Sequence, residues 1–225
     1  MEVLNAMLTA IREIFGNLRP RASEEDNIVK DGHREFVGGL WDEMGRLQFD
    51  FLVKQGLKPS HVFLDIACGA LRAGRLLIPY LEPGNYLGID KHPELIETGK
   101  ANEIGADMLE GKRPEFVISD CFSFEGFSKR PDFCIAQSLF THLRKQDIDV
   151  CFRKLAAFVG LGCRFFVSFN ETSIPIPQLA ASHSNRLFYY TRRKMEMFGR
   201  QSGWEPRYIG NWNHPRGLKM IEYVK

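Results

Sequence analysis

Three aspartates occur within or directly after apolar runs, and the first run leads into a loop of small residues. Asp65 begins the segment DIACG at residues 65–69, Asp90 comes 21 residues after Gly69, and Asp120 follows a third apolar run. A lone aspartate at the end of a strand is more often a turn or cap residue. Three of them aligned with one glycine loop favour a binding site, because carboxylates at neighbouring strand ends can accept hydrogen bonds from one polar ligand.

The glycine loop does not fit two common phosphate-binding patterns. Residues 69–74 have two glycines at the spacing of a P-loop, but Arg75 and Leu76 stand where that loop needs a lysine and a hydroxyl group. A dinucleotide site requires a third glycine for close packing of helix and strand, and Arg72 takes that position. The sequence therefore favours a ligand that brings no pyrophosphate against the backbone.

Residues 65–69 closely resemble motif I of the class I S-adenosylmethionine (SAM)-dependent methyltransferases, commonly written D-x-G-C-G, although Ala67 replaces the usual glycine. In that family the acidic residue after the second strand binds the ribose hydroxyls, which is the position of Asp90. The acidic residue after the third strand, here Asp120, accepts from the adenine amino group, and the backbone of the next residue, Cys121, faces the ring. The resemblance thus implies that SAM is the cofactor.

The resemblance continues after the fourth predicted strand. Residues 132–143 are similar to the family's segment at this position and contain Gln137, a predicted cofactor contact, and His142, the candidate general base. The alternative for His142 is a structural residue that packs or caps at a helix start. Together the motifs give these predicted cofactor-binding residues: Trp41, Asp65, Ala67, Gly69, Leu71, Arg72, Asp90, Lys91, Asp120, Cys121 and Gln137.

Two of these residues have structural alternatives. Arg72 either pairs with the methionyl carboxylate of SAM or lies on a helix surface, and Trp41 either covers the cofactor or packs in the core. Trp41 belongs to residues 36–41 (FVGGLW), which together with residues 212–217 (WNHPRG) look like signatures of a subgroup without an assigned substrate. Four further candidates for the acceptor side are more often solvated or structural residues in such positions: His183, Tyr189, Tyr190 and His214.

The implied reaction is in-line transfer of a methyl group from SAM to an oxygen or nitrogen of a small molecule, in which positioning supplies much of the rate. Nucleic-acid amino-methyltransferases of this superfamily carry an Asn/Asp-Pro-Pro-Tyr/Phe motif, which residues 137–140 (QSLF) do not match. The 30 basic and 28 acidic residues give no nucleic-acid footprint. The alternatives are a protein methyltransferase and a non-catalytic SAM-binding or scaffold protein.

Alternating strands and helices must position these residues. The apolar runs predict an α/β fold with a Rossmann-like, seven-stranded, mostly parallel sheet and helices on both faces. A short connection at residues 213–218 predicts a C-terminal antiparallel hairpin. The predicted strands cover residues 61–66, 86–90, 115–119, 133–138, 163–170, 207–212 and 219–224. The predicted helices cover residues 33–57, 74–81, 93–104, 145–158 and 191–202.

The 225 residues, 44% of them hydrophobic, suffice for one full domain with an appendage. Apolar residues at helical spacing over residues 3–18 predict a helix that packs on the main body or on a twin subunit in a homodimer. We expect an N-terminal helical extension and cofactor lid at residues 1–60 and the SAM-binding domain at residues 61–225. Five cysteines without a C-x-x-C pair predict no metal site and fit a cytoplasmic location, and no apolar run is long enough for a membrane span.

Overall fold

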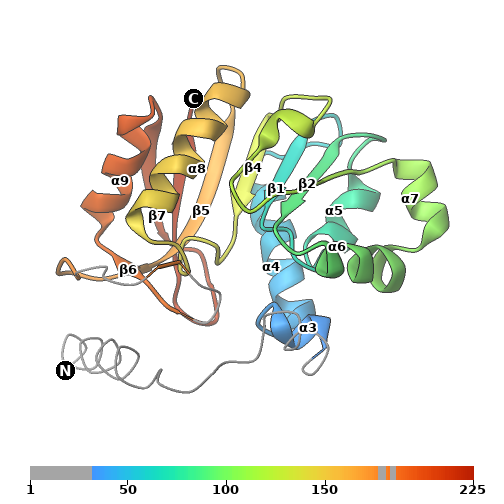
Figure 1. Ribbon diagram of the computed structural model, residues 1–225, viewed down its shortest axis with the longest axis horizontal. Helices are drawn as coiled ribbons and strands as arrows, with labels where there is room; N and C mark the ends of the chain where they lie inside the picture. Colours follow the sequence, from blue (N-terminus) through green and yellow to red (C-terminus); the bar gives the residue numbers. More distant parts are fainter. Residues whose placement is uncertain (1–31, 177–180, 183–185) are drawn as a thin grey trace.

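The computed structural model describes residues 32–176, 181–182 and 186–225 (Figure 1). The predicted helix at residues 3–18, and the dimer contact expected of it, lie outside the described residues. The strands are β1 (Phe63–Ile66), β2 (Tyr86–Asp90), β3 (Glu115–Ile118), β4 (Phe133–Ala136), β5 (Arg164–Glu171), β6 (Tyr189–Tyr190), β7 (Glu205–Asn211) and β8 (Lys219–Val224). The helices are α3 (His33–Phe36), α4 (Trp41–Lys54), α5 (Gly74–Tyr80), α6 (Pro93–Gly99), the π-helix η1 (Lys100–Ile104), α7 (Ala106–Lys112), the 3₁₀-helix η2 (Phe124–Gly126), α8 (Lys145–Phe158) and α9 (Arg192–Gln201).

The main sheet has the strand order β3-β2-β1-β4-β5-β8-β7, and the short strand β6 pairs with β5 off this path. Strands β1 to β5 pair in parallel, whereas β8 is antiparallel to both β5 and β7. The predicted seven-stranded sheet with its C-terminal hairpin is therefore confirmed. Because β1 lies between β2 and β4, the strand order reverses there, which is where open α/β sheets bind ligands.

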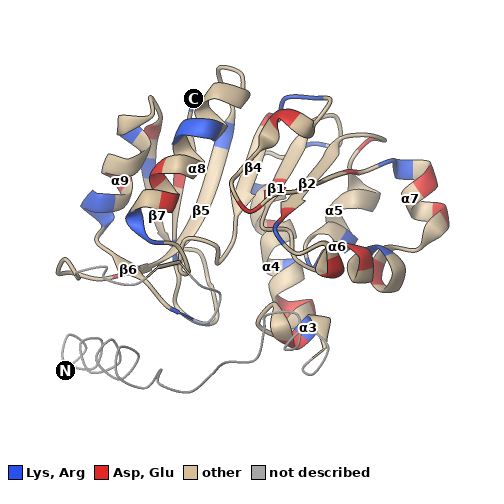
Figure 2. Cartoon of the chain, in the orientation of Figure 1, with Lys and Arg blue, Asp and Glu red and all other residues tan. Residues whose placement is uncertain are grey.

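Helices cover both faces of the sheet, and the alternation of side chains along each strand explains why. On β4, Phe133 and Ile135 belong to a buried cluster with side chains of α4 and α5, while Cys134 and Ala136 belong to a second cluster with α8 and α9. Figure 2 shows charged residues of both signs on α7, α8 and α9 and acidic residues on α6, with few charged residues on the strands between them. The strands are thus buried on both faces, as parallel sheets usually are.

The helical region predicted at residues 33–57 consists of two helices, α3 and α4. Gly38 and Gly39 have positive φ angles of 96° and 58°, and Leu40 follows with φ 47°. Glycine adopts this left-handed backbone without strain, and its occurrence here ends α3 and redirects the chain into α4. The break turns residues 33–41, which we call the lid segment, toward the loop after β1.

Other boundaries also differ from the predictions. Strand β4 ends at Ala136, two residues earlier than predicted, and Ser138 beyond it has φ 59°, which no strand accommodates. The helix predicted at residues 93–104 is α helix only to Gly99 and continues as a π-helix. Helix α7 and strand β6 were not predicted, because α7 has no buried residues and therefore no apolar stripe, and β6 is only two residues long.

None of the helices in the described part of the chain is long and apolar enough to cross a membrane. Within the same residues, no group of three or more His, Cys, Asp or Glu side chains is arranged to hold a metal ion.

Candidate functional site

The loop after β1 is held in an unusual backbone conformation beside β2. Ala67, Gly69 and Leu71 all have positive φ angles, of 62°, 53° and 64°. The N–H groups of Ala67 and Cys68 both donate to the carbonyl oxygen of Ile89, at 2.8 and 3.1 Å. Non-glycine residues with positive φ are strained and occur more often at ligand sites, so the loop geometry fits its predicted role.

The Asp90 carboxylate joins this loop to the end of β2. Oδ2 accepts from the N–H of Gly69 at 2.8 Å, and Oδ1 accepts from the N–H of His92 at 2.9 Å. The residue is only 7% exposed. Because a carboxylate oxygen has two lone pairs, each oxygen can still accept from a ligand hydroxyl.

Asp65 supports the loop from within the sheet. It is 4% exposed, and the hydroxyl of Tyr86 donates to its Oδ2 at 2.9 Å. Burial raises the pKa of Asp65 to about 7, against the lowering effect of the Tyr86 hydrogen bond. A Cβ on Gly74 would lie 2.9 Å from the Tyr86 hydroxyl oxygen, so α5 begins close against this pair.

The end of β3 offers an exposed apolar surface. Ile118, the last residue of the strand, is 56% exposed, and Asp120 and Cys121 after it are exposed as well. Hydrogen bonds with Ser123 and Ser119 lower the pKa of the Cys121 thiol. Ile118 is not among the residues predicted from the sequence, although its position shortly before the predicted adenine site is a sign that it contributes apolar area there.

The lid segment lies directly over the glycine loop. A Cβ on Gly69 would stand 3.0 Å from Cγ1 of Val37, and the ring of Phe36 meets that of His92 edge-on at 5.8 Å between centroids. Trp41 is 7% exposed and packs with Ala70 of the loop in a small buried cluster. The buried Nε1 of Trp41 has no hydrogen-bond partner among the described residues.

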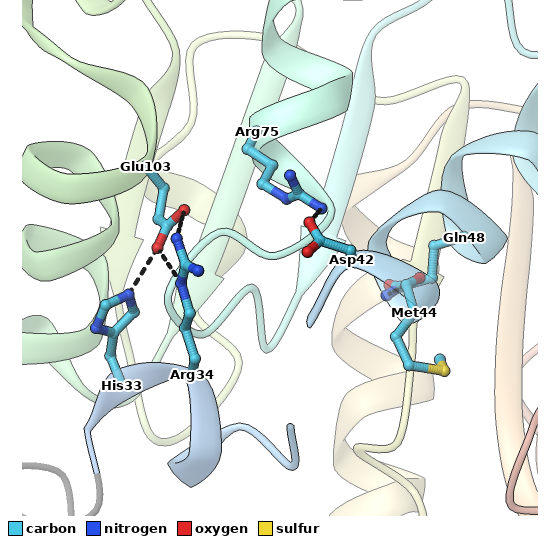
Figure 3. Close-up of polar contacts among 7 residues, drawn as sticks. All are labelled: His33, Arg34, Asp42, Met44, Gln48, Arg75 and Glu103. Carbon is cyan, nitrogen blue, oxygen red and sulfur yellow. Dashed lines mark hydrogen bonds and ion pairs between the residues drawn. The ribbon is translucent and has the colours of Figure 1, made fainter. Parts of the chain in front are cut away.

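Ion pairs fix both ends of the lid segment (Figure 3). At its start, His33 Nε2 and Arg34 Nε lie 2.7 and 2.8 Å from Oε1 of Glu103, and Arg34 Nη2 donates to Oε2 at 3.0 Å. Burial raises the pKa of Glu103, but these hydrogen bonds outweigh it and lower the pKa below its ordinary value. Just beyond the segment, Asp42 accepts from Arg75 Nη2 at 2.7 Å.

Arg72 connects the glycine loop to the lid segment and to the end of β4. Its Nη1 donates to the carbonyl oxygens of Val37 and Gly39, at 3.0 and 3.1 Å, and Nη2 donates to Oε1 of Gln137 at 2.9 Å. Its buried Nε has no partner among the described residues. Burial lowers the pKa of Arg72 to about 10. The alternative of a helix-surface arginine is therefore wrong.

The turn between β7 and β8 completes the cluster. Arg216 Nη2 donates to the carbonyl oxygen of Gly38 at 2.5 Å, and Nε2 of His214 lies 3.2 Å from Nε2 of Gln137. The two sequence stretches without an assigned substrate, FVGGLW and WNHPRG, thus meet each other. A small pocket lies between them, lined by Val37, Leu40, Met44, Arg72, Gln137, Ser138, His214 and Arg216.

His142 is half-buried after β4, and it does not line this pocket. Its Nδ1 donates to the carbonyl oxygen of Arg186 at 2.7 Å, which leaves Nε2 as the basic nitrogen of the neutral ring. Tyr190 is buried in the core, and its hydroxyl donates to the carbonyl of Leu143. His183 lies outside the described residues.

The remaining predicted contacts differ in exposure. The Leu71 side chain is fully buried in the core, so only the backbone of this residue can contribute to a ligand site at the loop. Lys91 is exposed after β2. Of the predicted set, the structure brings together Trp41, Gly69, Arg72, Asp90 and Gln137 around the lid segment and the glycine loop.

Comparisons with solved structures give many similar chains. Magnesium protoporphyrin IX methyltransferase from Synechocystis PCC 6803 with bound SAM aligns over 96% of each chain, with a TM-score of 0.61 and 14% identity. Human N-acetylserotonin methyltransferase in complex with SAM aligns over 95% of this chain and 61% of that one, with a TM-score of 0.65 and 15% identity. The glycopeptide N-methyltransferase MtfA complexed with SAM aligns over 80% of this chain and 93% of that one, with a TM-score of 0.62 and 13% identity.

This chain has the class I methyltransferase fold. At these identities the similarity shows the fold alone. No protein-family model matches the sequence, and no curated protein matches it at a significant level.

The residues at the switch point of the sheet fit SAM in chemical type. The ribose hydroxyls need an acceptor such as the Asp90 carboxylate, and the adenine ring needs apolar surface such as that of Ile118. The methionyl carboxylate needs a donor, and the buried Nε of Arg72 is one without a partner among the described residues. The donor set therefore agrees with a SAM site.

Proposed function

We propose that the chain is a SAM-dependent methyltransferase that acts on an oxygen or nitrogen of a small molecule. The observation that carries the proposal is the Asp90 carboxylate, hydrogen-bonded to the N–H of Gly69 at the switch point of the sheet. This arrangement brings a hydroxyl-binding group against a loop that lets a ligand approach its backbone. It occurs in a fold whose solved examples include SAM complexes.

Each part of the cofactor has a candidate partner in the chain. Asp90 would bind the ribose hydroxyls, and Ile118, Asp120 and the Cys121 backbone would bind the adenine. Arg72 would bind the methionyl carboxylate through Nε. When bound, SAM supplies a methyl group that its sulfonium has already activated.

The protein's own contribution is to align the acceptor and to exclude water. The lid segment covers the glycine loop through Val37 and Trp41, and its two anchoring ion-pair groups hold it there. Holding two reactants in line lowers the barrier by about 7–11 kcal/mol in favourable cases. His142, with Nε2 as its basic nitrogen, would remove a proton from acceptors that must lose one.

A small acceptor is favoured over the macromolecular classes. Basic and acidic residues are nearly balanced, at 30 and 28, so the chain lacks the excess of positive charge that binds a phosphate backbone. The pocket beside Arg72 encloses about 20 Å³, and larger acceptors require the lid segment to move. A protein substrate and non-catalytic binding are outcomes of the test below.

The test is transfer of a labelled methyl group. The purified protein is incubated with methyl-tritiated SAM and a metabolite extract, and label is measured in the small-molecule and macromolecular fractions. We expect label in the small-molecule fraction, which Asp90→Ala strongly reduces and Asp107→Ala, at an exposed site on α7, leaves unchanged. Binding of S-adenosylhomocysteine (SAH) without any transfer would support the scaffold alternative, and label confined to macromolecules would support a protein methyltransferase.

A further inference from the structure

The pocket between the lid segment and the β7–β8 turn carries positive charge without an acidic partner in its lining. Among the described residues that line it, the charged ones are two arginines, Arg72 from the glycine loop and Arg216 from the turn, and none is an aspartate or glutamate. The described partners of both guanidinium groups are neutral: the carbonyl oxygens of residues 37, 38 and 39, and the amide oxygen of Gln137. An anion in this pocket would therefore be stabilised by two cations.

Two hydrogen-bond donors face the ring of His214 in the same pocket. The backbone N–H of Arg216 points to Nδ1 at 3.1 Å, and the Gln137 amide nitrogen, which also donates to Ser138 Oγ at 3.1 Å, lies 3.2 Å from Nε2. Burial first, and then the two arginines, lower the pKa of His214 to about 4, so its neutral ring has one N–H and one acceptor nitrogen. Only one of the two donors can be satisfied by the ring.

Turning the Gln137 amide over does not remove this conflict. The exchanged amide would accept from the His214 ring, but its NH₂ group would then face Nη2 of Arg72, another donor. The unpartnered Nε of Arg72 adds one more donor to the same cluster. In either orientation the described residues leave one donor of this cluster without an acceptor, and an anionic group of a ligand would supply it.

The carboxylate of SAM does not by itself balance the positive charge of this pocket. SAM carries an ammonium and a sulfonium group against one carboxylate, so its binding adds net positive charge next to the two arginines. Arg216 is exposed at the rim of the pocket, where an incoming molecule can reach it. Its described partner, the Gly38 carbonyl, is a neutral group that a carboxylate or phosphate oxygen can replace with a stronger, charge-assisted hydrogen bond.

We propose that the methyl acceptor is a small organic anion, and that Arg216 binds its anionic group in this pocket. The proposal rests on the function proposed above and adds the charge of the substrate. It gives Arg216 the role of a specificity-determining residue for the acceptor. The Trp212–Gly217 turn is then part of the acceptor site.

The experiment fractionates the acceptors by charge before the reaction. A metabolite extract is separated at pH 7 on ion-exchange resins into anionic, neutral and cationic pools, and each is incubated with methyl-tritiated SAM and the full chain. We expect label from the anionic pool. Label only from the neutral or cationic pool would overturn the proposal while leaving the methyltransferase function intact, and no label from any pool would overturn the function itself.

Variants then separate Arg216 from the cofactor site. Arg216→Gln should lower kcat/KM for the anionic pool by about 10- to 100-fold, mainly through KM, because a charged hydrogen bond is lost. Arg216→Lys should restore part of this loss, and Arg207→Gln, an exposed position on the same hairpin that does not line the pocket, should behave as wild type.

The affinity for SAH shows whether Arg216 binds the anionic group of the acceptor or the carboxylate of the cofactor. By calorimetry, Arg216→Gln should bind SAH within about twofold of wild type. If SAH affinity falls as far as kcat/KM does, the anion held by Arg216 belongs to the cofactor, and the proposal is wrong. All variants are first checked for the wild-type unfolding transition, and the lysine variant keeps the test valid if the glutamine variant does not fold.

Discussion

Ala67 carries a side chain in a backbone conformation that suits glycine. Its φ is 62°, and the family that the loop resembles has glycine at this position. An L-residue in the left-handed region costs about 1–2 kcal/mol, while glycine adds unfolded-state entropy worth about 0.5–1 kcal/mol. The strain at Ala67 therefore follows directly from the one departure of this loop from its motif.

We predict opposite effects of substitution at two positions in this loop. Ala67→Gly should leave the free energy of unfolding unchanged or raise it by up to about 1 kcal/mol. Gly69→Ala should lower it by about 1–3 kcal/mol, because its φ is 53° and the new Cβ would stand 3.0 Å from Val37 Cγ1. Urea unfolding of both variants measures the difference, and equal effects would contradict the strain assigned to Ala67.

Asp65 gives the protein a pH-dependent stability. Because burial raises its pKa to about 7, the folded state holds a proton that the unfolded state has lost. Stability contributed by this group is complete below the unfolded pKa near 4 and declines as the pH rises to about 7, by up to about 1.4 kcal/mol per pH unit. Asp65→Asn removes this dependence and keeps an acceptor for the Tyr86 hydroxyl.

The measurement is the difference in unfolding free energy between Asp65→Asn and wild type at pH values from about 4 to 8. The unfolding free energy of the variant relative to wild type should rise with pH up to about pH 7 and then stay constant. The comparison with wild type is needed because His214 also makes stability depend on pH. The pKa of His214 is lowered to about 4, so the stability that this group contributes is lost as the pH falls below its pKa in the unfolded state. A difference independent of pH would contradict the raised pKa of Asp65.

At the scale of single residues, motif spacing predicted only those site residues that lie at or shortly after the end of a strand. Gly69, Asp90 and Gln137 were predicted because each has a fixed place in the alternation of strands and helices. The contact between Arg216 and Gly38 joins residues 178 positions apart, and no local pattern encodes it. The sequence pointed to both stretches without indicating that they meet.

At the scale of elements, helix α6 packs tightly against the glycine loop. A Cβ on Gly99, the last residue of α6, would lie 2.6 Å from the carbonyl oxygen of Ala70. Backbone atoms cannot yield as a flexible side chain can. Gly99 thus allows the helix and the loop to approach each other, and in this way α6 fixes the position of the loop.

We predict that Gly99→Ala lowers the free energy of unfolding by about 1–3 kcal/mol through this clash. The matched control is Gly111→Ala on exposed helix α7, where a Cβ meets nothing within 4 Å. There alanine should raise stability by about 0.5–1 kcal/mol, as it does in an exposed helix interior. Urea unfolding measures both, and a stable Gly99→Ala variant would contradict the close packing of α6 on the loop.

The lid segment shows why element boundaries were harder to predict than element types. Its apolar residues continue the helical spacing of α4, and from the sequence they predict a helical region over residues 33–57 without showing where it breaks. Gly38 and Gly39 instead turn the chain, and the turn is held by Arg72 and Arg216. These tertiary hydrogen bonds override a pattern that is helical on both sides of the break.

At the scale of the whole molecule, the fold was the most predictable feature. Strands that alternate with helices form a parallel sheet with right-handed crossovers, and the short final connection requires an antiparallel hairpin. The observed order, β3-β2-β1-β4-β5-β8-β7, follows these rules and brings the glycine loop to the switch point. The identity of the acceptor is not encoded at this scale, because it depends on a pocket assembled from the lid segment, β4 and the hairpin turn.

The central claim is that this switch point binds SAM, with Asp90 on the ribose. The most direct test is calorimetric titration of the wild-type chain with SAH, with Asp90→Ala measured beside it. We predict one molecule of SAH per chain and an affinity at least about tenfold weaker in Asp90→Ala, since a buried carboxylate that accepts from hydroxyls contributes about 1.5–3 kcal/mol. No binding to the wild-type chain, or equal affinity in the variant, would contradict the account.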